Sequence, residues 1–275
     1  MILRNLFPQQ KTKALTLSYD DGILQDERLC ALLRKNGIKA TFNLNSGSMA
    51  EGSTFSKNGL LIERLPPERV AEVYEGFEIA VHGVRHAYPS AIPADCLPGE
   101  IYEDRRALEA LAGYPVQGMA YAYGEYNRRV METLRCLGIV YARTVRSTHS
   151  FRQPEDFLSW NPTCHHADPE LPALCDRFLE GNRLGHCPIF YLWGHSYEFD
   201  VDRNWEIIES FCERMAGKDD IWYATNIEIY RYLQALDSLV SSCDGKMLYN
   251  PSAIAVSVTA DGVPLTVGPG ELCRL

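Results

Sequence analysis

The chain has 275 residues, and 27 Lys and Arg against 36 Asp and Glu give it a formal net charge of -9. This balance disfavours nucleic acid as a partner, because phosphate neutralisation by basic residues dominates nucleic-acid affinity. With 46% hydrophobic and 23% charged residues, the composition is that of a folded protein with a large core, which excludes disorder, collagen and coiled coil.

The N-terminal segment and the cysteines indicate where in the cell the protein is found. Residues 1–13 contain no apolar run long enough for a signal-peptide core, and no segment approaches the roughly 20 apolar residues that cross a bilayer. The 9 cysteines are scattered, unlike the framework of a small secreted domain. The sequence therefore predicts a soluble, cytoplasmic protein with reduced thiols and no membrane partner.

Strand and helix patterns alternate along most of the chain. Short β-branched or aromatic runs predict strands, and amphipathic segments predict helices between them. In chain order the predicted elements are strand 14–19, helix 26–36, strand 40–44, helix 66–74, strand 77–81, helix 100–111, a strand ending near 123, helix 127–137, strand 139–144, helix 171–179, strand 188–193, helix 205–215, strand 221–224 and helix 227–236. This alternation requires parallel pairing, and so an α/β sheet or a closed parallel barrel.

The C-terminal segment has a different pattern. Residues 253–259 and 263–267 flank Asp261-Gly262, a pair that readily adopts the positive φ angles of a two-residue hairpin turn. We therefore expect two units, a barrel at 1–236 and a small β appendage at 237–275 that packs on the barrel.

Two acidic residues and a glycine follow the first strand. The side chains of Asp20 and Asp21 point to opposite faces of an extended strand, so they converge on one site only if the chain turns, which Gly22 allows. The alternative is a solvated loop, since Asp-Asp-Gly is common turn chemistry.

Histidines follow two further strands. His82 and His86 are four residues apart after the third strand, a spacing that suits a bidentate metal site. Two histidines and one aspartate would make an open catalytic site for a transition metal, which lowers the pKa of a bound water to about 7. His195 follows the strand at 188–193 and is either a structural histidine or the acid that protonates a leaving group.

These motifs resemble the polysaccharide deacetylase family, metal-dependent carbohydrate N- and O-deacetylases, over about residues 12–236. Residues 17–22 are similar to the family motif Thr-Phe-Asp-Asp-Gly, 82–86 to its His-x-x-x-His motif, and 123–124 to the Tyr-Gly of its third motif. The resemblance implies a distorted seven-stranded (β/α)7 barrel. It also implies these roles: Asp20 as base, His195 as acid, Asp21, His82 and His86 as metal ligands, and the backbone N–H of Tyr123 facing the oxyanion.

The chain departs from the family in the arginine of the third motif, which orients the base. Residues 120–122 occupy that slot and include no arginine. We therefore expect another cation, one of Arg85, Arg143 and Arg146, to orient Asp20, unless the base is tuned in another way.

Two further departures concern neighbours of the site. Gly83 replaces the Ser or Thr that usually follows the first histidine of the metal motif. Ser159 stands before Trp160, where the family has an acidic residue, so the partner of His195 is not identified by the sequence.

A second polar cluster comprises Cys164, His165, His166 and Asp168, with Cys175, His186 and Cys187 downstream. The spacing matches no compact structural zinc pattern, so we favour His165 or His166 as a residue lining the substrate cleft over a second zinc site. Several aromatic residues are candidates for stacking on sugar faces, or else belong to the core. They are Tyr121, Tyr123, Trp160, Trp193 and Tyr197.

The sequence thus predicts a metal-dependent hydrolase that removes acetyl groups from an N-acetylated sugar or polysaccharide. Zinc is the first choice of metal, and cobalt, nickel and iron tolerate the same ligands. The alternatives are hydrolysis of another amide or cyclic amide, including a small one, hydrolysis of an acetyl ester, and a non-catalytic protein that retains metal and sugar binding. The sequence does not indicate an oligomeric state.

Overall fold

The structure, a computed structural model, describes residues 2–50, 52–181 and 187–275. Its centre is a parallel sheet of 8 strands. These are β2 (Lys13–Asp20), β3 (Ala40–Leu44), β6 (Glu78–Val81), β7 (Gly118–Ala120), β8 (Tyr141–Arg143), β9 (Cys164–His165), β10 (Ile189–Gly194) and β11 (Ile221–Tyr223). The predicted strands are all present. The periodicity missed β9, because two residues are too few to show an alternation.

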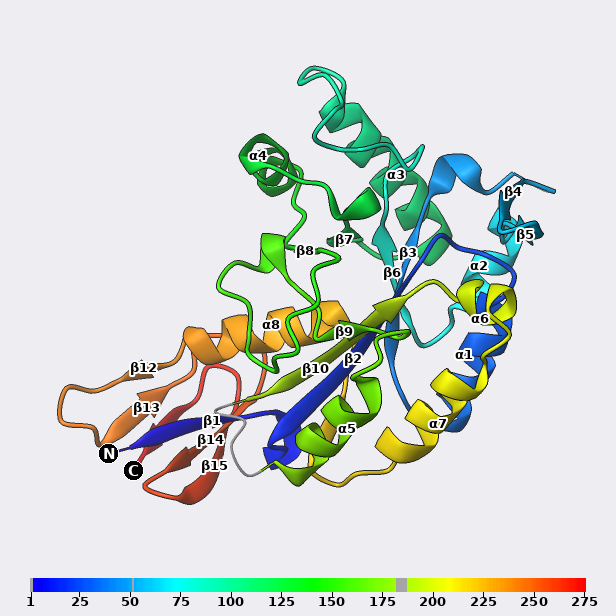
Figure 1. Cartoon of the computed structure of the whole chain (residues 1–275). Helices are drawn as coiled ribbons and strands as arrows, with labels where there is room; N and C mark the ends of the chain where they lie inside the picture. Colours follow the sequence, from blue (N-terminus) through cyan, green and yellow to red (C-terminus); the bar gives the residue numbers. More distant parts are fainter. Residues whose placement is uncertain (1, 51, 182–186) are drawn as a thin grey trace.

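The strands pair in the order β8-β7-β6-β3-β2-β10-β9, and β11 pairs with the first residues of β2. The pairs are all parallel. The sheet curls, with β8 and β9 as the ends of the described order (Figure 1). The fold is therefore the distorted (β/α)7 type of barrel that the family resemblance implies.

Helices follow the strands and form a layer outside the sheet. They are α1 (Asp26–Lys35), α2 (Pro67–Val73), α3 (Leu97–Ala112), α4 (Arg128–Cys136), α5 (Leu171–Glu180), α6 (Glu198–Val201), α7 (Glu206–Met215) and α8 (Asn226–Asp237). Most of this layer packs in the order α5, α7, α1, α2, α3, α4. In contrast, α8 contacts β2 and the C-terminal strand β14 (Val256–Ala260).

The alternation of side chains along the strands separates two cores. Tyr19 belongs to the core beneath the outer helices, whereas Ala14 belongs to the core beneath α8. Because successive side chains on a strand point to opposite faces, Asp20 is the last residue of β2 on the same face as Ala14. On β8, Tyr141 lies in the core beneath α8, so Arg143 points to that same inner face.

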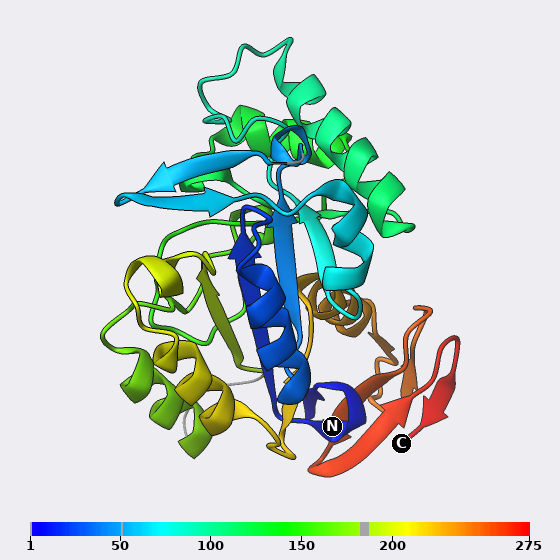
Figure 2. The ribbon, with the colours of Figure 1, turned by 90° about the vertical axis from the view of Figure 1, so that its right-hand side faces the viewer.

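The C-terminal segment forms more than the predicted hairpin. That hairpin is β14 with β15 (Val263–Val267), and β1 (Leu3–Leu6) pairs with β14 as a third strand. A second antiparallel sheet consists of β12 (Val240–Ser241), β13 (Met247–Tyr249) and β16 (Leu272–Arg274). Figure 2 shows the orange and red C-terminal strands beside the blue N-terminal segment. No local pattern predicts the pairing of β1, because its partner lies at the other end of the chain.

An antiparallel hairpin precedes α2. It consists of β4 (Thr54–Lys57) and β5 (Leu60–Glu63), and it was not predicted from the sequence. Its inner residue Phe55 packs against Tyr197, which follows β10. The hairpin ends at Arg64, which it brings to the site described below.

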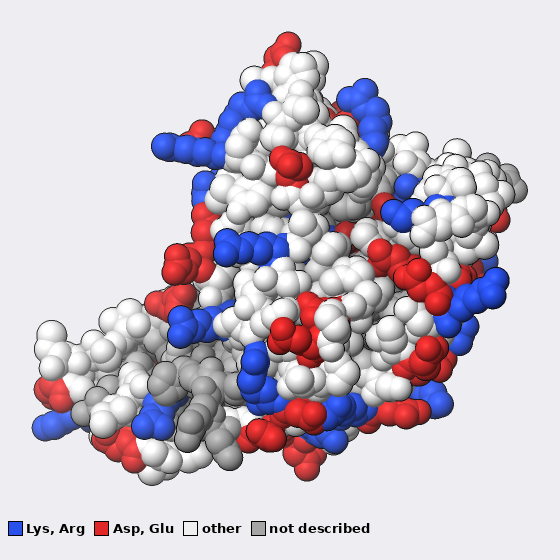
Figure 3. Space-filling view, viewed as in Figure 1, with Lys and Arg blue, Asp and Glu red and all other residues white. Residues whose placement is uncertain are grey.

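The surface is of mixed charge on the face shown in Figure 3, where acidic and basic side chains are interspersed. Within the described ranges, none of the helices has both the length and the apolar composition that crossing a membrane requires.

Candidate active site

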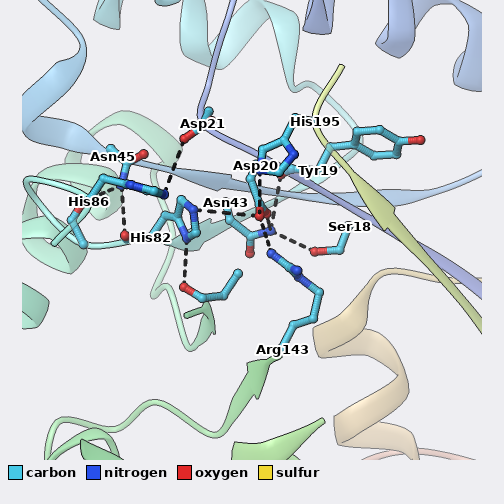
Figure 4. Close-up of polar contacts among 12 residues, drawn as sticks. Ser18, Tyr19, Asp20, Asp21, Asn43, Asn45, His82, His86, Arg143 and His195 are labelled. Carbon is cyan, nitrogen blue, oxygen red and sulfur yellow. Dashed lines mark hydrogen bonds and ion pairs between the residues drawn. The ribbon is translucent and has the colours of Figure 1, made fainter. Parts of the chain in front are cut away.

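The two aspartates after β2 converge because the chain turns there. Asp21 has a φ of 87° and Gly22 a φ of 62°. Positive φ is uncommon for a residue other than glycine and concentrates at functional sites. The turn that the sequence predicts at Gly22 therefore begins at Asp21 itself, and it brings both carboxylates to the same end of the sheet (Figure 4).

The histidine pair after β6 is held by buried polar groups. Asp104 accepts hydrogen bonds from the backbone N–H groups of His82 and Gly83 at 3.1 and 2.9 Å. Gly83 has a φ of 86°, a backbone conformation that glycine adopts readily and other residues rarely. His82 Nδ1 lies 2.8 Å from the carbonyl oxygen of Ala120. Since a carbonyl only accepts, Nδ1 carries the proton and the lone pair of Nε2 faces the site.

The side chains of Asp21, His82 and His86 fit a transition-metal centre. Each offers one ligand atom, and these atoms lie within 4.8 Å of one another. His82 Nε2 and Asp21 Oδ1 are buried and make no hydrogen bond to the described residues, as expected of atoms that donate to a metal. Burial and the neighbouring His82 lower the pKa of His86 to about 4, so its ring is neutral and able to coordinate.

Asp20 lies beside these ligands but has other partners. Its Oδ1 accepts a hydrogen bond of 2.8 Å from Asn43 Nδ2, and its Oδ2 pairs with Arg143. The Nε2 atoms of His82 and His195 each lie 3.8 Å from the same Oδ2. Burial raises the pKa of Asp20, but Arg143 and the two histidines outweigh burial and hold it below its ordinary value. Asp20 is therefore an ionised carboxylate next to the candidate metal centre.

Arg143 is the arginine that pairs with Asp20. It is fully buried, and its guanidinium lies 4.4 Å from the centre of the Trp193 ring. Of the other two candidates, Arg85 pairs with Glu100 at 3.0 Å, and Arg146 is exposed. The structure therefore brings Arg143, and neither of the other arginines, to Asp20.

His195 has an acidic partner that the sequence analysis missed. Its Nδ1 lies 3.3 Å from Glu198 Oε2, and its backbone N–H donates to the same oxygen at 3.1 Å. Burial lowers the pKa of His195, but the carboxylates of Glu198 and Asp20 outweigh it and raise that pKa to about 9. The sequence does contain a feature that could have identified this partner, because Glu198 stands three positions after His195, at the start of α6.

His165 and His166 also contact Glu198. Their Nε2 atoms are 3.1 and 3.3 Å from Glu198 Oε2. The backbone N–H of Ala167 donates to His165 Nδ1 at 3.2 Å, which places the proton of a neutral His165 on Nε2, facing Glu198. His165, His195 and Glu198 have ligand atoms within 4.8 Å of one another, so this group could also hold a metal ion. The hydrogen bond to His165 Nδ1 favours a network of imidazole donors around one carboxylate instead.

The sequence analysis favoured His165 or His166 as a residue that lines the substrate cleft, and only His165 is exposed enough for that position. His165 is partly exposed, whereas His166 is buried and stacks on Phe199. A Cβ at Gly194 would lie 2.1 Å from His166 Nδ1, so the backbone of β10 passes directly against this ring. His186, which belonged to the same predicted cluster, lies outside the described residues.

Two of the predicted sugar-stacking residues are core residues instead. Tyr121 is fully buried, and its hydroxyl donates to the carbonyl of Leu158 at 2.7 Å. Trp160 is buried between Tyr141 and Tyr191. Tyr121 belongs to the core beneath the outer helices and Trp160 to the core beneath α8, and the sequence pattern around these short elements did not reveal either burial.

Of the other three predicted aromatic residues, Tyr197 is buried in a small core cluster, with its ring 5.2 Å from that of His195. The remaining two lie at the site. Trp193 is nearly buried between Arg143 and the His165 ring, whose centroid is 4.7 Å away. Tyr123 is half exposed and meets the His86 ring edge-on, with centroids 4.5 Å apart. Its φ of 58° turns the backbone at the end of the barrel.

Arg64 is a second cation that sequence patterns did not single out. Its Nη1 lies 3.3 Å from Asp21 Oδ1 and donates to the carbonyl oxygen of Asp21. Burial raises the pKa of Asp21, but His195, Arg64 and the histidine pair lower it below its ordinary value. The unpredicted hairpin thus helps to keep a candidate metal ligand ionised.

The chain matches one known family. Residues 8–142, about half of the chain, match the family model described as polysaccharide deacetylase. A comparison with curated proteins finds no match.

Solved structures share the fold at low identity. A putative polysaccharide deacetylase from Mycobacterium smegmatis is 18% identical, with a TM-score of 0.61 over 85% of this chain and 94% of that chain. A family 4 carbohydrate esterase from Streptomyces lividans, in complex with acetate, is 17% identical, with a TM-score of 0.51 over 76% and 90%. A CE4 family pseudoenzyme from Bacillus anthracis is 17% identical, with a TM-score of 0.50 over 82% and 68%. The family match and the shared fold together make this chain a divergent member of the polysaccharide deacetylase family.

Proposed function

We propose that the protein is a metal-dependent hydrolase that removes the acetyl group from an N-acetylated sugar. The observation that carries this proposal is the placement of Asp20. An ionised, buried carboxylate with its own arginine lies beside three convergent metal ligands, and His195 lies 3.8 Å away. A base and an acid thus flank one candidate metal centre, as hydrolysis of an amide requires.

Asp21, His82 and His86 would hold the metal. When bound, a divalent metal lowers the pKa of a water molecule and polarises a carbonyl oxygen. Two imidazoles and one carboxylate suit zinc first, and cobalt, nickel and iron are compatible with the same set.

Two side chains would then carry out the two proton transfers of the reaction. Asp20 takes a proton from the attacking water, because Arg143 and Asn43 keep it ionised and oriented. His195 gives a proton to the departing nitrogen, because Glu198 favours its imidazolium form. The backbone N–H of Tyr123 is proposed to donate to the oxyanion, as the family resemblance implies.

An acetylated carbohydrate is the substrate class that family membership and the acetate complex of the Streptomyces lividans esterase support. Hydrolysis of another carbon–nitrogen bond uses the same acid and base, so it remains the second candidate. An acetyl ester would depend less on His195, since an alkoxide leaves more easily than an amide nitrogen. A non-catalytic role is the third candidate, and the pairing of Arg143 with Asp20 is the observation against it.

Metal removal is the first test of the proposed function. Purified protein is expected to contain about one transition-metal ion per chain, and chelation is expected to abolish acetate release from a panel of N-acetylated sugars and acetylated glycans. Readdition of zinc should restore it, which serves as the control. Acetate release that persists in the metal-free protein would contradict the proposal. Ammonia or a ring-opened product without acetate would favour the second candidate.

The pairing of His195 with Glu198 gives a pH test. An acid with a pKa of about 9 loses its proton above that pH, so the rate should fall on the alkaline side near pH 9. Glu198→Gln removes the neighbouring negative charge, and this fall should move to lower pH by about one unit or more. Initial rates between pH 5 and 10, on the order of ten points, measure the shift. An alkaline limb at the same pH in both proteins would show that Glu198 does not act on His195.

A further inference from the structure

A buried aspartate lies between two loops of the candidate active site. Asp26 is the first residue of α1, and both it and Ser196 are fully buried. The Ser196 hydroxyl donates to Asp26 Oδ1 at 2.6 Å, and the backbone N–H of Ile23 donates to Asp26 Oδ2 at 3.2 Å. Ser196 directly follows His195, and Ile23 comes two residues after Asp21. One carboxylate therefore bridges the loop of a candidate metal ligand and the loop of the candidate acid.

The same carboxylate is held by a third group, in apolar surroundings. The hydroxyl of Tyr74, which follows α2, donates to Asp26 Oδ2 at 2.7 Å. Ile23 and Tyr197 belong to one small core cluster, so the two loops also pack through side chains. Burial outweighs the hydrogen bonds and raises the pKa of Asp26 to about 6. Because an unsatisfied polar atom in such an interior is costly, each of these bonds constrains the geometry of its loop.

The bridge bears on the position of His195. The backbone N–H of Glu198 donates to the carbonyl oxygen of His195 at 3.1 Å, and Ser196 lies inside this turn. The Nε2 atom of His195 lies 3.8 Å from Asp20 Oδ2, at the candidate metal centre. A misplacement of about 1 Å can lower a rate by about a hundredfold. The bond between Ser196 and Asp26 therefore acts where a small movement has a large effect.

We propose that Asp26 is a positioning residue that holds the loops after β2 and β10 at a fixed separation through Ile23 and Ser196, and so places His195 for proton donation to the leaving group. This inference rests on the proposed function, since it concerns how that proton is delivered. The role is one of shape and hydrogen bonding, so a neutral side chain with the same shape should fill it.

Two hydroxyl removals make a matched pair, because Ser196→Ala and Tyr74→Phe each take one donor from Asp26. Rates of the zinc-loaded protein are measured on an N-acetylated sugar, whose nitrogen needs a proton to leave, and on an aryl acetate, whose phenolate leaves without one. Ser196→Ala should lower kcat on the amide by about tenfold, part of the roughly hundredfold or more that a general acid supplies. Its KM and its rate on the aryl acetate should change little. Tyr74→Phe should preserve both rates, because it leaves the bridge between the loops intact.

Variants of Asp26 separate shape from charge. Asp26→Leu keeps the bulk, loses the bridge and should show the same selective loss on the amide. Asp26→Asn should stay near wild type, because its amide oxygen can accept from Ile23 and Tyr74 while its Nδ2 donates to the Ser196 hydroxyl. Ser196→Ala removes a single hydroxyl, so it keeps the test valid if Asp26→Leu does not fold.

Glu78 provides the control for a loss of stability. It is a buried acid at the start of β6 that accepts hydrogen bonds from Thr41, Tyr141 and Ile227. Glu78→Met should destabilise the protein, because it leaves these donors unpaired, but it should not change the ratio of the amide rate to the aryl acetate rate.

A measurement without substrate separates this inference from the proposed function. The pKa of His195 is followed by NMR in the zinc-loaded protein, with His195→Gln to identify its signal. It should fall by about 0.5 or more in Ser196→Ala, because the ring moves away from the carboxylates of Glu198 and Asp20, and it should stay the same in Tyr74→Phe. A wild type that releases no acetate from N-acetylated sugars would contradict the proposed function alone. An unchanged His195 pKa in Ser196→Ala would overturn the inference, as would equal effects on the two substrates.

Discussion

Asp20→Asn is expected to lower turnover by about two orders of magnitude or more, the usual scale for a general base, while the metal content stays the same. The reason is the division of roles between neighbours, since the ligand atom comes from Asp21, and Asp20 is held by Asn43 and Arg143. Asparagine keeps the size of the side chain but accepts no proton from water at neutral pH. Acetate release and the metal-to-protein ratio are measured on the same preparation.

The neighbouring aspartate gives the matched control. Asp21→Asn makes the same chemical change one position along the chain, and it should lose metal and activity together, because an amide oxygen is a weaker ligand than a carboxylate. Asp20→Asn with nearly full activity would contradict the role of Asp20 as base and would revive a binding protein as an interpretation. Loss of metal from Asp20→Asn would instead make Asp20 a ligand.

Arg143→Met is expected to have the largest combined effect on stability and activity. Arg143 and Asp20 are both buried, so removing the cation leaves a carboxylate without its charge partner in the interior. Breaking a buried pair in this way costs about 3–5 kcal/mol in the free energy of unfolding. The pKa of Asp20 should rise as well, so the acidic limb of the rate–pH profile should move to higher pH. Denaturant unfolding and initial rates measure the two effects.

A double variant distinguishes the pair from ordinary packing. Arg143→Met combined with Asp20→Asn removes both charges and should recover much of the lost stability, but none of the activity. Arg143→Lys keeps the charge without the planar fork and should fall between wild type and Arg143→Met. If the double variant is as unstable as the sum of the single changes, Arg143 acts by filling space and not by pairing with Asp20.

The parts of the candidate site that the sequence places together, as the structure does, are those encoded within one loop. Asp20 and Asp21 are adjacent, and His82 and His86 are four residues apart, so a single turn of the backbone suffices to bring each pair together. The ends of the strands could also be predicted, because buried strands of a parallel sheet are near-continuous apolar runs that end at a glycine or a charged residue. The element order followed from the same patterns.

The parts that the sequence does not predict involve distant partners. β8 and β2 are separated in the sheet by β7, β6 and β3, so only the curl of the sheet brings Arg143 to Asp20. From the sequence alone, Arg85 and Arg146 were as good candidates as Arg143 for the cation beside Asp20. Arg64 reaches Asp21 through a hairpin whose short strands have no clear periodicity.

The burial of the aromatic residues also depends on distant segments that only the fold brings together. Tyr121, Trp160 and Tyr123 had the same standing in the sequence as sugar-stacking candidates, yet two are core residues and one is at the surface. By itself, the sequence determined the alternation of strands and helices, the family resemblance and the chemical types at the strand ends, because these depend on neighbours along the chain. The tertiary structure alone decided which cation orients Asp20, which acid accompanies His195 and which rings meet solvent, because those contacts depend on sheet order and curvature, which arise only when distant segments pack together.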